Sequence, residues 1–242
     1  MNVTFLGTSH GVPEANRRCS CVLLTIAGAR YVIDAGTPVM AALRSIQADV
    51  DSVKGVFLTH MHGDHSNGLI EFVDLCTWYF KSAKPLIHVP EIAARDAILN
   101  WMNLIHGRDC SEEMPEFRAV TPGAFYDDGV LRMTAIPNAH LSNRPSYSYL
   151  VEAEGKRLVF TGDLSADFAD FPAAAFEKTC DLVVTEAAHC RLTSAVDIFR
   201  RVRTKQLYVS HIAPWNEPEV AKLRALVPYP VALARDNLTI EV

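Results

Sequence analysis

Short apolar runs separated by turn residues make up the first part of the chain. Residues 2–6 and 53–58 are short, largely apolar runs, which is typical of strands. Two further runs flank the turn Ala27-Gly28-Ala29, and this pattern predicts a β-hairpin. Thr37 and Pro38 have the residue types preferred at a helix N-cap and first helical position. In this part we expect strands at 2–6, 21–26, 30–34, 53–58 and 86–89, and helices from 38, at 69–81 and at 91–105.

The pattern changes twice in the remainder of the chain. Residues 107–129 carry Pro115, Pro122 and only weak periodicity, so we expect a variable loop there that covers a site. Three β-type runs follow from Val130, and strands then alternate with helices. The expected strands lie at 130–136, 147–152, 157–161, 182–185, 206–209 and 238–241, and the expected helices at 193–202 and 217–226.

Length and composition fit a globular α/β protein. With 242 residues, 49% hydrophobic and 21% charged, the chain can form one domain spanning residues 1–242. The net charge of −5 provides no positive field toward nucleic acid, so a nucleic-acid partner is disfavoured but stays open. No apolar run is long enough to span a membrane and no basic leader precedes the first strand, so we expect a cytoplasmic protein. The six cysteines are expected to be reduced.

Four residues able to bind a metal lie within six positions, in His60-Met61-His62-Gly63-Asp64-His65. The motif follows the apolar run 53–58 and precedes a helical pattern, so it ends a strand and opens a helix. Imidazole nitrogen and carboxylate oxygen suit zinc, and a tight turn can direct neighbouring side chains at one point. The alternative is a polar loop with clustered histidines, and we favour the metal site.

Other candidate residues stand at the ends of expected strands. They are Asp34, His140, Asp163 and His211. Asp34 either orients a ligand histidine or serves as a turn residue. His140 and Asp163 taken alone would be read as structural, and they become candidates only together with the motif. His88 and His106 have no partners in sequence and are interpreted as structural.

The motif and these strand-end residues, in this order, resemble the metallo-β-lactamase superfamily. The resemblance covers nearly the whole chain and implies an αβ/βα four-layer sandwich of two mixed sheets with helices outside. Carried over by position, His60, His62 and His140 would hold one zinc ion, Asp64, His65 and His211 the other, and Asp163 would bridge them. Manganese and iron are alternatives. Each ion would keep an open position for a shared hydroxide, the nucleophile of a dinuclear hydrolase.

A narrower resemblance is to the ribonuclease Z and small phosphodiesterase branch. Phe5-Leu6-Gly7-Thr8 and Ser146-Tyr147-Ser148-Tyr149 are similar to segments of those enzymes, as is Thr185-Glu186-Ala187-Ala188-His189. The resemblance implies catalytic roles for Asp64, for His189 as an acid or phosphate-binding group, and for Glu186 as its support. A hydrogen-bonded loop histidine is the alternative for His189. His10 either reaches substrate or packs within its turn.

One departure from ribonuclease Z bears on the substrate. That enzyme has a long tRNA-binding arm between its third and fourth motifs, but only 22 residues separate His140 from Asp163 here. We therefore expect hydrolysis of a small phosphodiester, such as a cyclic nucleotide or a nucleotide-like molecule. The alternatives are an acyl hydrolase acting on a lactone, thioester or β-lactam, a ribonuclease Z-like endonuclease, and a non-catalytic metal-binding module. A homodimer is compatible with these expectations.

Overall fold

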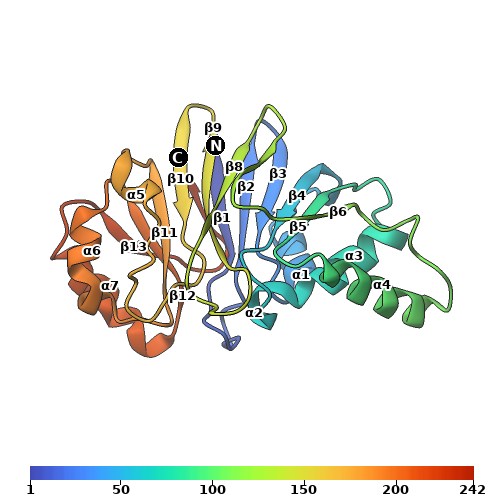
Figure 1. Cartoon of the computed structure of the whole chain (residues 1–242), viewed down its shortest axis with the longest axis horizontal. Helices are drawn as coiled ribbons and strands as arrows, with labels where there is room; N and C mark the ends of the chain where they lie inside the picture. Colours follow the sequence, from blue (N-terminus) through green and yellow to red (C-terminus); the bar gives the residue numbers. More distant parts are fainter.

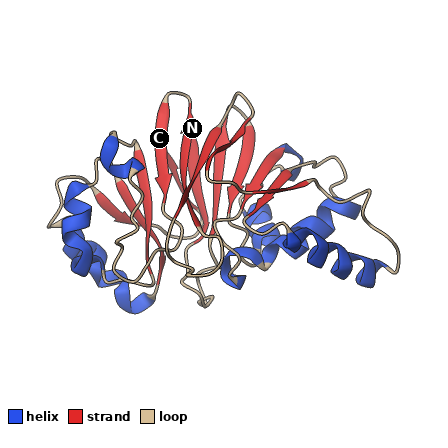
Figure 2. Cartoon of the chain, in the orientation of Figure 1, coloured by secondary structure: helices blue, strands red, loops and turns tan.

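Two seven-stranded sheets pack face to face, with helices on both outer flanks (Figure 1, Figure 2). The computed structural model describes residues 1–242. The order of the first sheet is β14 (Leu238–Glu241), β1 (Asn2–Gly7), β2 (Cys21–Ile26), β3 (Ala29–Ile33), β4 (Val53–Phe57), β5 (Leu86–Val89) and β6 (Phe117–Ala119). The order of the second is β13 (Val231–Leu233), β12 (Leu207–Ile212), β11 (Leu182–Ala187), β10 (Lys156–Phe160), β9 (Tyr147–Ala153), β8 (Arg132–Pro137) and β7 (Gly123–Asp127).

The helices divide between the two flanks. Helices α1, α3 and α4 cover the first sheet, and α5, α6 and α7 cover the second (Figure 1). Their bounds are α1 Val39–Ser45, α2 Gly63–Ser66, α3 Gly68–Trp78, α4 Ala93–His106, α5 Ala174–Glu177, α6 Val196–Arg201 and α7 Glu217–Arg224. Three short 3₁₀ helices complete the list, η1 (Val50–Ser52), η2 (Leu192–Ala195) and η3 (Pro214–Asn216). No helix has the length and apolarity needed to cross a membrane.

The central strands of each sheet are apolar on both faces because each sheet lies between two layers. In β2, Val22 and Leu24 point into the core between the sheets, whereas Cys21 and Leu23 point toward the helices of the first flank. Side chains of one strand alternate between its two faces, so a strand buried on both sides reads as a continuous apolar run. This is why the sequence predicts the central strands well. The six cysteines are all buried and free.

The differences from the expected elements lie in short segments. Residues 107–129, expected to be a loop, contain β6 and β7, the edge strands through which the chain passes from one sheet to the other. The short elements β13 and α5 were not expected. The expected Thr37 N-cap is wrong as well. Helix α1 begins at Val39, and the Thr37 hydroxyl instead donates to Cys19 Sγ at 3.8 Å.

Candidate metal centre

The candidate ligands stand where strands of both sheets end. His60 follows β4, and α2 carries Asp64 and His65 directly behind His62. On the second sheet, His140 follows β8, Asp163 follows β10 and His211 lies near the end of β12. Gly162 has a φ of 59°, and a Cβ there would come within 2.9 Å of the Tyr147 carbonyl oxygen. Only glycine fits in this conformation so close to another backbone. The turn at Gly162 directs the chain after β10 so that Asp163 faces the first sheet.

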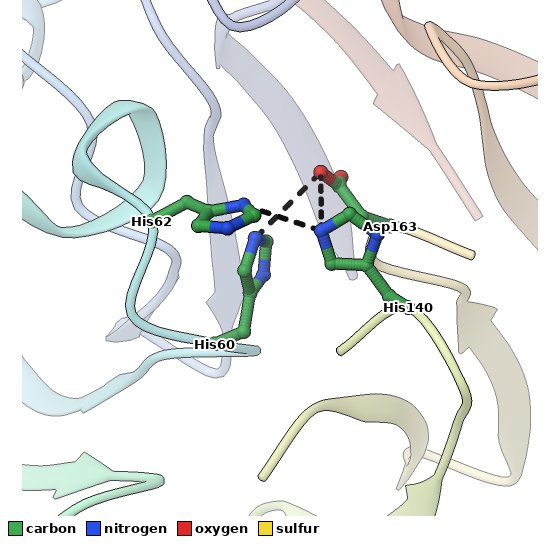
Figure 3. A group of neighbouring side chains, drawn as sticks. All are labelled: His60, His62, His140 and Asp163. Atoms are coloured by element: carbon green, nitrogen blue, oxygen red, sulfur yellow. Dashed lines mark hydrogen bonds and ion pairs between the residues drawn. The ribbon is translucent and has the colours of Figure 1, made fainter. Parts of the chain in front are cut away.

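The first group of side chains consists of His60, His62, His140 and Asp163 (Figure 3). Its ligand atoms all lie within 4.8 Å of one another. His62 Nδ1 is 3.2 Å from His140 Nε2, and Asp163 Oδ2 is 3.6 Å from His60 Nε2 and 3.7 Å from His140 Nε2. Figure 3 shows the three rings and the carboxylate pointing toward a common centre. Three imidazoles with one carboxylate form a suitable donor set for a transition metal.

The second group consists of Asp64, His65 and His211, and it also adjoins Asp163. Asp64 Oδ2 is 3.3 Å from His65 Nε2 and 3.7 Å from His211 Nε2. Asp163 Oδ1 is 3.3 Å from His65 Nε2, and Asp163 Oδ2 is 3.4 Å from His211 Nε2. The structure thus brings all seven predicted ligands together, with Asp163 between the two groups.

Three polar atoms of the cluster are buried without a hydrogen-bond partner, namely His60 Nε2, His65 Nε2 and Asp163 Oδ1. Buried polar atoms normally have partners because an unpaired one costs about 1–3 kcal/mol. A bound cation would satisfy all three. Burial and the neighbouring His65 lower the pKa of His60 to about 2, so its ring is neutral and keeps a lone pair. Burial opposes ionisation of Asp163, but His211 and His65 outweigh it and hold its pKa well below the usual range. The site can bind a metal.

Polar side chains orient the histidine rings from behind. His65 Nδ1 lies 2.7 Å from Asp34 Oδ2, and His211 Nδ1 lies 2.8 Å from Ser20 Oγ. Thr59 Oγ1 lies 3.1 Å from His60 Nδ1 and is itself hydrogen-bonded to Asp34. Such contacts fix which nitrogen faces the metal. Of the two alternatives for Asp34, the structure favours the orienting carboxylate. No role was predicted for Thr59 or Ser20, and a hydroxyl next to a ligand or in a loop is too common to signal one.

His189 lies at the mouth of the site, with its side chain 35% exposed. Its Nδ1 is 2.9 Å from Glu186 Oε1 and 3.9 Å from Asp163 Oδ2. Glu186 is buried and also accepts the backbone N–H groups of Leu164, Ala188 and His189. The hydrogen bond to Glu186 raises the pKa of His189. His189 is also near enough to Asp163 and His211 to be a ligand, but its Nδ1 is hydrogen-bonded to Glu186 and its side chain is partly exposed.

The remaining histidines lie outside the cluster. His10 Nε2 is 3.0 Å from Glu14 Oε1, and His106 Nε2 is 2.7 Å from Asp74 Oδ1. His88 is buried and stacks on Phe57 at a centroid distance of 5.1 Å. His88 and His106 are therefore structural, as predicted.

Comparison with known proteins places the fold and the family. A family model described as "Anti-Pycsar protein Apyc1" matches residues 1–219. The zinc phosphodiesterase ELAC protein 1 of Mus musculus is 33% identical over 111 residues, which cover 44% of this chain and 30% of that protein. Ribonuclease Z of Mycolicibacterium gilvum is 23% identical over 176 residues, covering 67% and 61%. The chain thus spans less than two thirds of these curated relatives.

Solved structures confirm the predicted fold. The metallo-β-lactamase fold protein YhfI of Bacillus subtilis superposes with a TM-score of 0.79 at 18% identity, covering 100% of this chain and 99% of that one. The short form of human tRNase Z, ELAC1, gives a TM-score of 0.77 at 23% identity with the same coverage. The two mixed sheets with outer helices are the expected αβ/βα sandwich of the metallo-β-lactamase fold. Because the family model covers most of its length, the chain belongs to the Anti-Pycsar protein Apyc1 family.

Proposed function

We propose that the protein is a dinuclear metal hydrolase that cleaves a small phosphodiester, a cyclic nucleotide or a nucleotide-like molecule. His60, His62 and His140 would hold one zinc ion, Asp64, His65 and His211 the other, and Asp163 would bridge them. The observation that carries the proposal is the position of Asp163, whose carboxylate faces imidazoles of both groups at 3.3–3.7 Å. When bound, two zinc ions would supply a water activated near neutral pH and positive charge for the phosphoryl oxygens. Manganese or iron would suit the same donors.

His189 is proposed to protonate the leaving oxygen. A general acid needs a proton near neutral pH and a place beside the reacting group. The hydrogen bond that His189 donates to Glu186 raises the pKa of His189, and the ring lies at the mouth next to His140, with centroids 4.7 Å apart. Glu186 accepts a hydrogen bond from Nδ1 of His189, so Nε2 of His189 is free to carry a proton toward the substrate. Glu186 therefore acts as a positioning residue. Asp64 would contribute to catalysis as a ligand of the second zinc ion, beside His65.

Two features support a small substrate. The segment from His140 to Asp163 is occupied by β9, β10 and the short turns around them, so it holds no protruding arm of the kind that binds tRNA. The net charge of −5 offers no extended attraction for a polynucleotide. Because the candidate ligands come from both sheets, we also propose that residues 1–242 act as one catalytic domain.

Metal-dependent turnover provides the first test. Purified protein is assayed on bis(p-nitrophenyl) phosphate and p-nitrophenyl acetate, with chelator and with added zinc. We expect chelator-sensitive cleavage of the diester and its loss in His62→Ala, while the melting temperature shows a folded protein. Cleavage of the ester alone would favour the acyl hydrolase. Full metal loading without any turnover would favour a non-catalytic module.

Leaving-group dependence tests His189. An alkoxide leaves poorly without a proton, whereas p-nitrophenolate leaves readily by itself. Replacing His189 with Ala should therefore reduce kcat on adenosine 3′,5′-cyclic phosphate by roughly 10²–10⁴-fold and that on bis(p-nitrophenyl) phosphate far less. His106→Ala is the matched control, because His106 is also paired with a carboxylate but lies on α4, outside the cluster of candidate ligands. Equal losses on both substrates would contradict the acid role.

We further propose a homodimer formed through α4. Its Trp101, Leu104 and Ile105 are 50%, 72% and 48% exposed. They follow one another at helical spacing, so they form one apolar ridge on the outer side of the helix. Light scattering after size exclusion should give twice the mass of 26.7 kDa, and Leu104→Glu should give the monomer mass. A monomer mass for the unaltered protein would exclude the dimer.

A further inference from the structure

Two segments far apart in the sequence close one side of the candidate metal centre. The backbone N–H of Ile212 donates to the carbonyl of Thr8 at 3.2 Å. The buried Arg17 donates to the carbonyl of Ile212 at 3.1 Å and forms an ion pair with Glu217. The loop that follows β1 is therefore fixed against the turn that follows His211.

Trp215 is the most exposed large aromatic residue of this rim. It is 72% exposed, and its only aromatic neighbour is His10, at a centroid distance of 5.2 Å and an interplanar angle of 66°. His10 is held in turn by Glu14, with Nε2 to Oε1 at 3.0 Å. Covering the apolar surface of an indole is energetically favourable, yet no segment of residues 1–242 covers the indole of Trp215. The ring is thus supported at one side and open to solvent over most of its surface.

The aromatic pair stands next to the second metal-site group, which consists of Asp64, His65 and His211. Trp215 follows His211 by four residues, and the amide of Asn216 donates to the Ala187 carbonyl at 2.7 Å, which fixes η3 to the end of the strand that leads to His189. On the side of the first loop, a Cβ on Gly11 would lie 3.9 Å from Asp64 Oδ2. His10 and Trp215 therefore border the Asp64 and His211 side of the site.

We propose that Trp215, supported by His10, is the platform on which the nucleobase of the substrate stacks. The inference rests on the proposed function. A nucleotide whose phosphate lies at the metal centre carries its base one ribose away, so the base reaches the rim. A flat π-system matches an exposed indole, and stacking of this kind tolerates any base because every base has a π-face. Trp215 is then a specificity residue that favours diesters with a nucleobase over diesters without one, and His10 is a positioning residue.

Ligands with and without a base test the platform. Isothermal titration calorimetry of the zinc-loaded protein compares adenosine 5′-monophosphate with ribose 5-phosphate, which presents the same phosphate and lacks the base. We expect Trp215→Ala to weaken binding of the nucleotide roughly tenfold and to leave that of ribose 5-phosphate unchanged. Trp215→Phe should retain most of the affinity, and His10→Ala should lose part of it.

The control variant is Trp78→Ala, because Trp78 is 47% exposed on α3 and should change neither affinity. Equal weakening of both ligands by Trp215→Ala would overturn the proposal, as would unchanged nucleotide binding or no nucleotide binding by the unaltered protein. The measurement needs no turnover, so it separates the two claims. If the protein cleaves diesters but fails this test, the proposed function stands and the stacking platform is refuted. If it binds nucleotides selectively but cleaves no diester, the platform stands and the proposed function is refuted.

Discussion

Replacing Asp34 with Asn should weaken the binding of one of the two proposed metal ions without unfolding the protein. Asp34 is buried and accepts the backbone N–H of Thr59 at 2.8 Å, and its Oδ2 lies 2.7 Å from His65 Nδ1. Its φ of 59° lies in the left-handed region, which Asn also tolerates, so the backbone needs no change. The substitution keeps the oxygen that accepts from Thr59 and replaces the Oδ2 that faces His65 Nδ1 and also contacts the Thr59 hydroxyl.

The magnitude follows from the tautomer of His65. Asn has a single acceptor oxygen, and Thr59 requires it, so the amide NH₂ faces His65 Nδ1. The ring must then accept at Nδ1 and carry its proton on Nε2, the atom directed at Asp64 and Asp163. A protonated Nε2 cannot bind a metal. Losing such an orienting contact typically costs tenfold to a hundredfold in metal affinity, roughly 1.4–2.7 kcal/mol.

Competition with a chromophoric zinc chelator provides the assay. The unaltered protein should bind two equivalents of zinc, and Asp34→Asn should bind the second equivalent ten to a hundred times more weakly, with the first unchanged. Asp236→Asn is the matched control, because Asp236 accepts hydrogen bonds from Thr8 and from the Arg18 backbone but contacts no histidine. Two unchanged zinc affinities in Asp34→Asn would refute this account of His65, and loss of both equivalents would show that the two groups do not bind separately.

Two further predictions concern stability. Gly36→Ala should destabilise the protein by about 1–3 kcal/mol, because a Cβ there would lie 2.2 Å from the Asp64 carbonyl oxygen and 2.6 Å from Cys19 Cβ; Gly11→Ala, where the nearest atom is 3.9 Å away, should show no such loss in urea unfolding. His88 should make stability pH-dependent, since burial and then Arg118 lower its pKa from 6.5 to about 4. As pH falls from 6.5 to 4 the unfolded state binds a proton that the folded state excludes, so the free energy of unfolding should decrease by roughly 3 kcal/mol and level off below pH 4. His88→Phe should abolish this part of the pH dependence, and an identical profile for both proteins would contradict it.

The sequence by itself determined the central strands and the candidate ligands. A strand buried on both faces, such as β2, appears as a nearly continuous apolar run, and this signal is local. The motif from His60 to His65 is a local signal as well, because its four possible metal ligands can be recognised without knowing any distant residue. His140, Asp163 and His211 could be identified because each follows or ends an expected strand, and a resemblance to known proteins supplied their order.

Tertiary structure alone decided the partners of these residues. The edge strands β6 and β7 have weak local patterns and exist because a longer strand of each sheet pairs with them. Ser20 meets His211 across 191 positions, and Arg17 meets Ile212 across 195. His10 and Trp215 come together in the same way. Hydrogen bonds and ring contacts depend on positions within fractions of an ångström, which sheet pairing fixes between distant residues and which no pattern along the chain records.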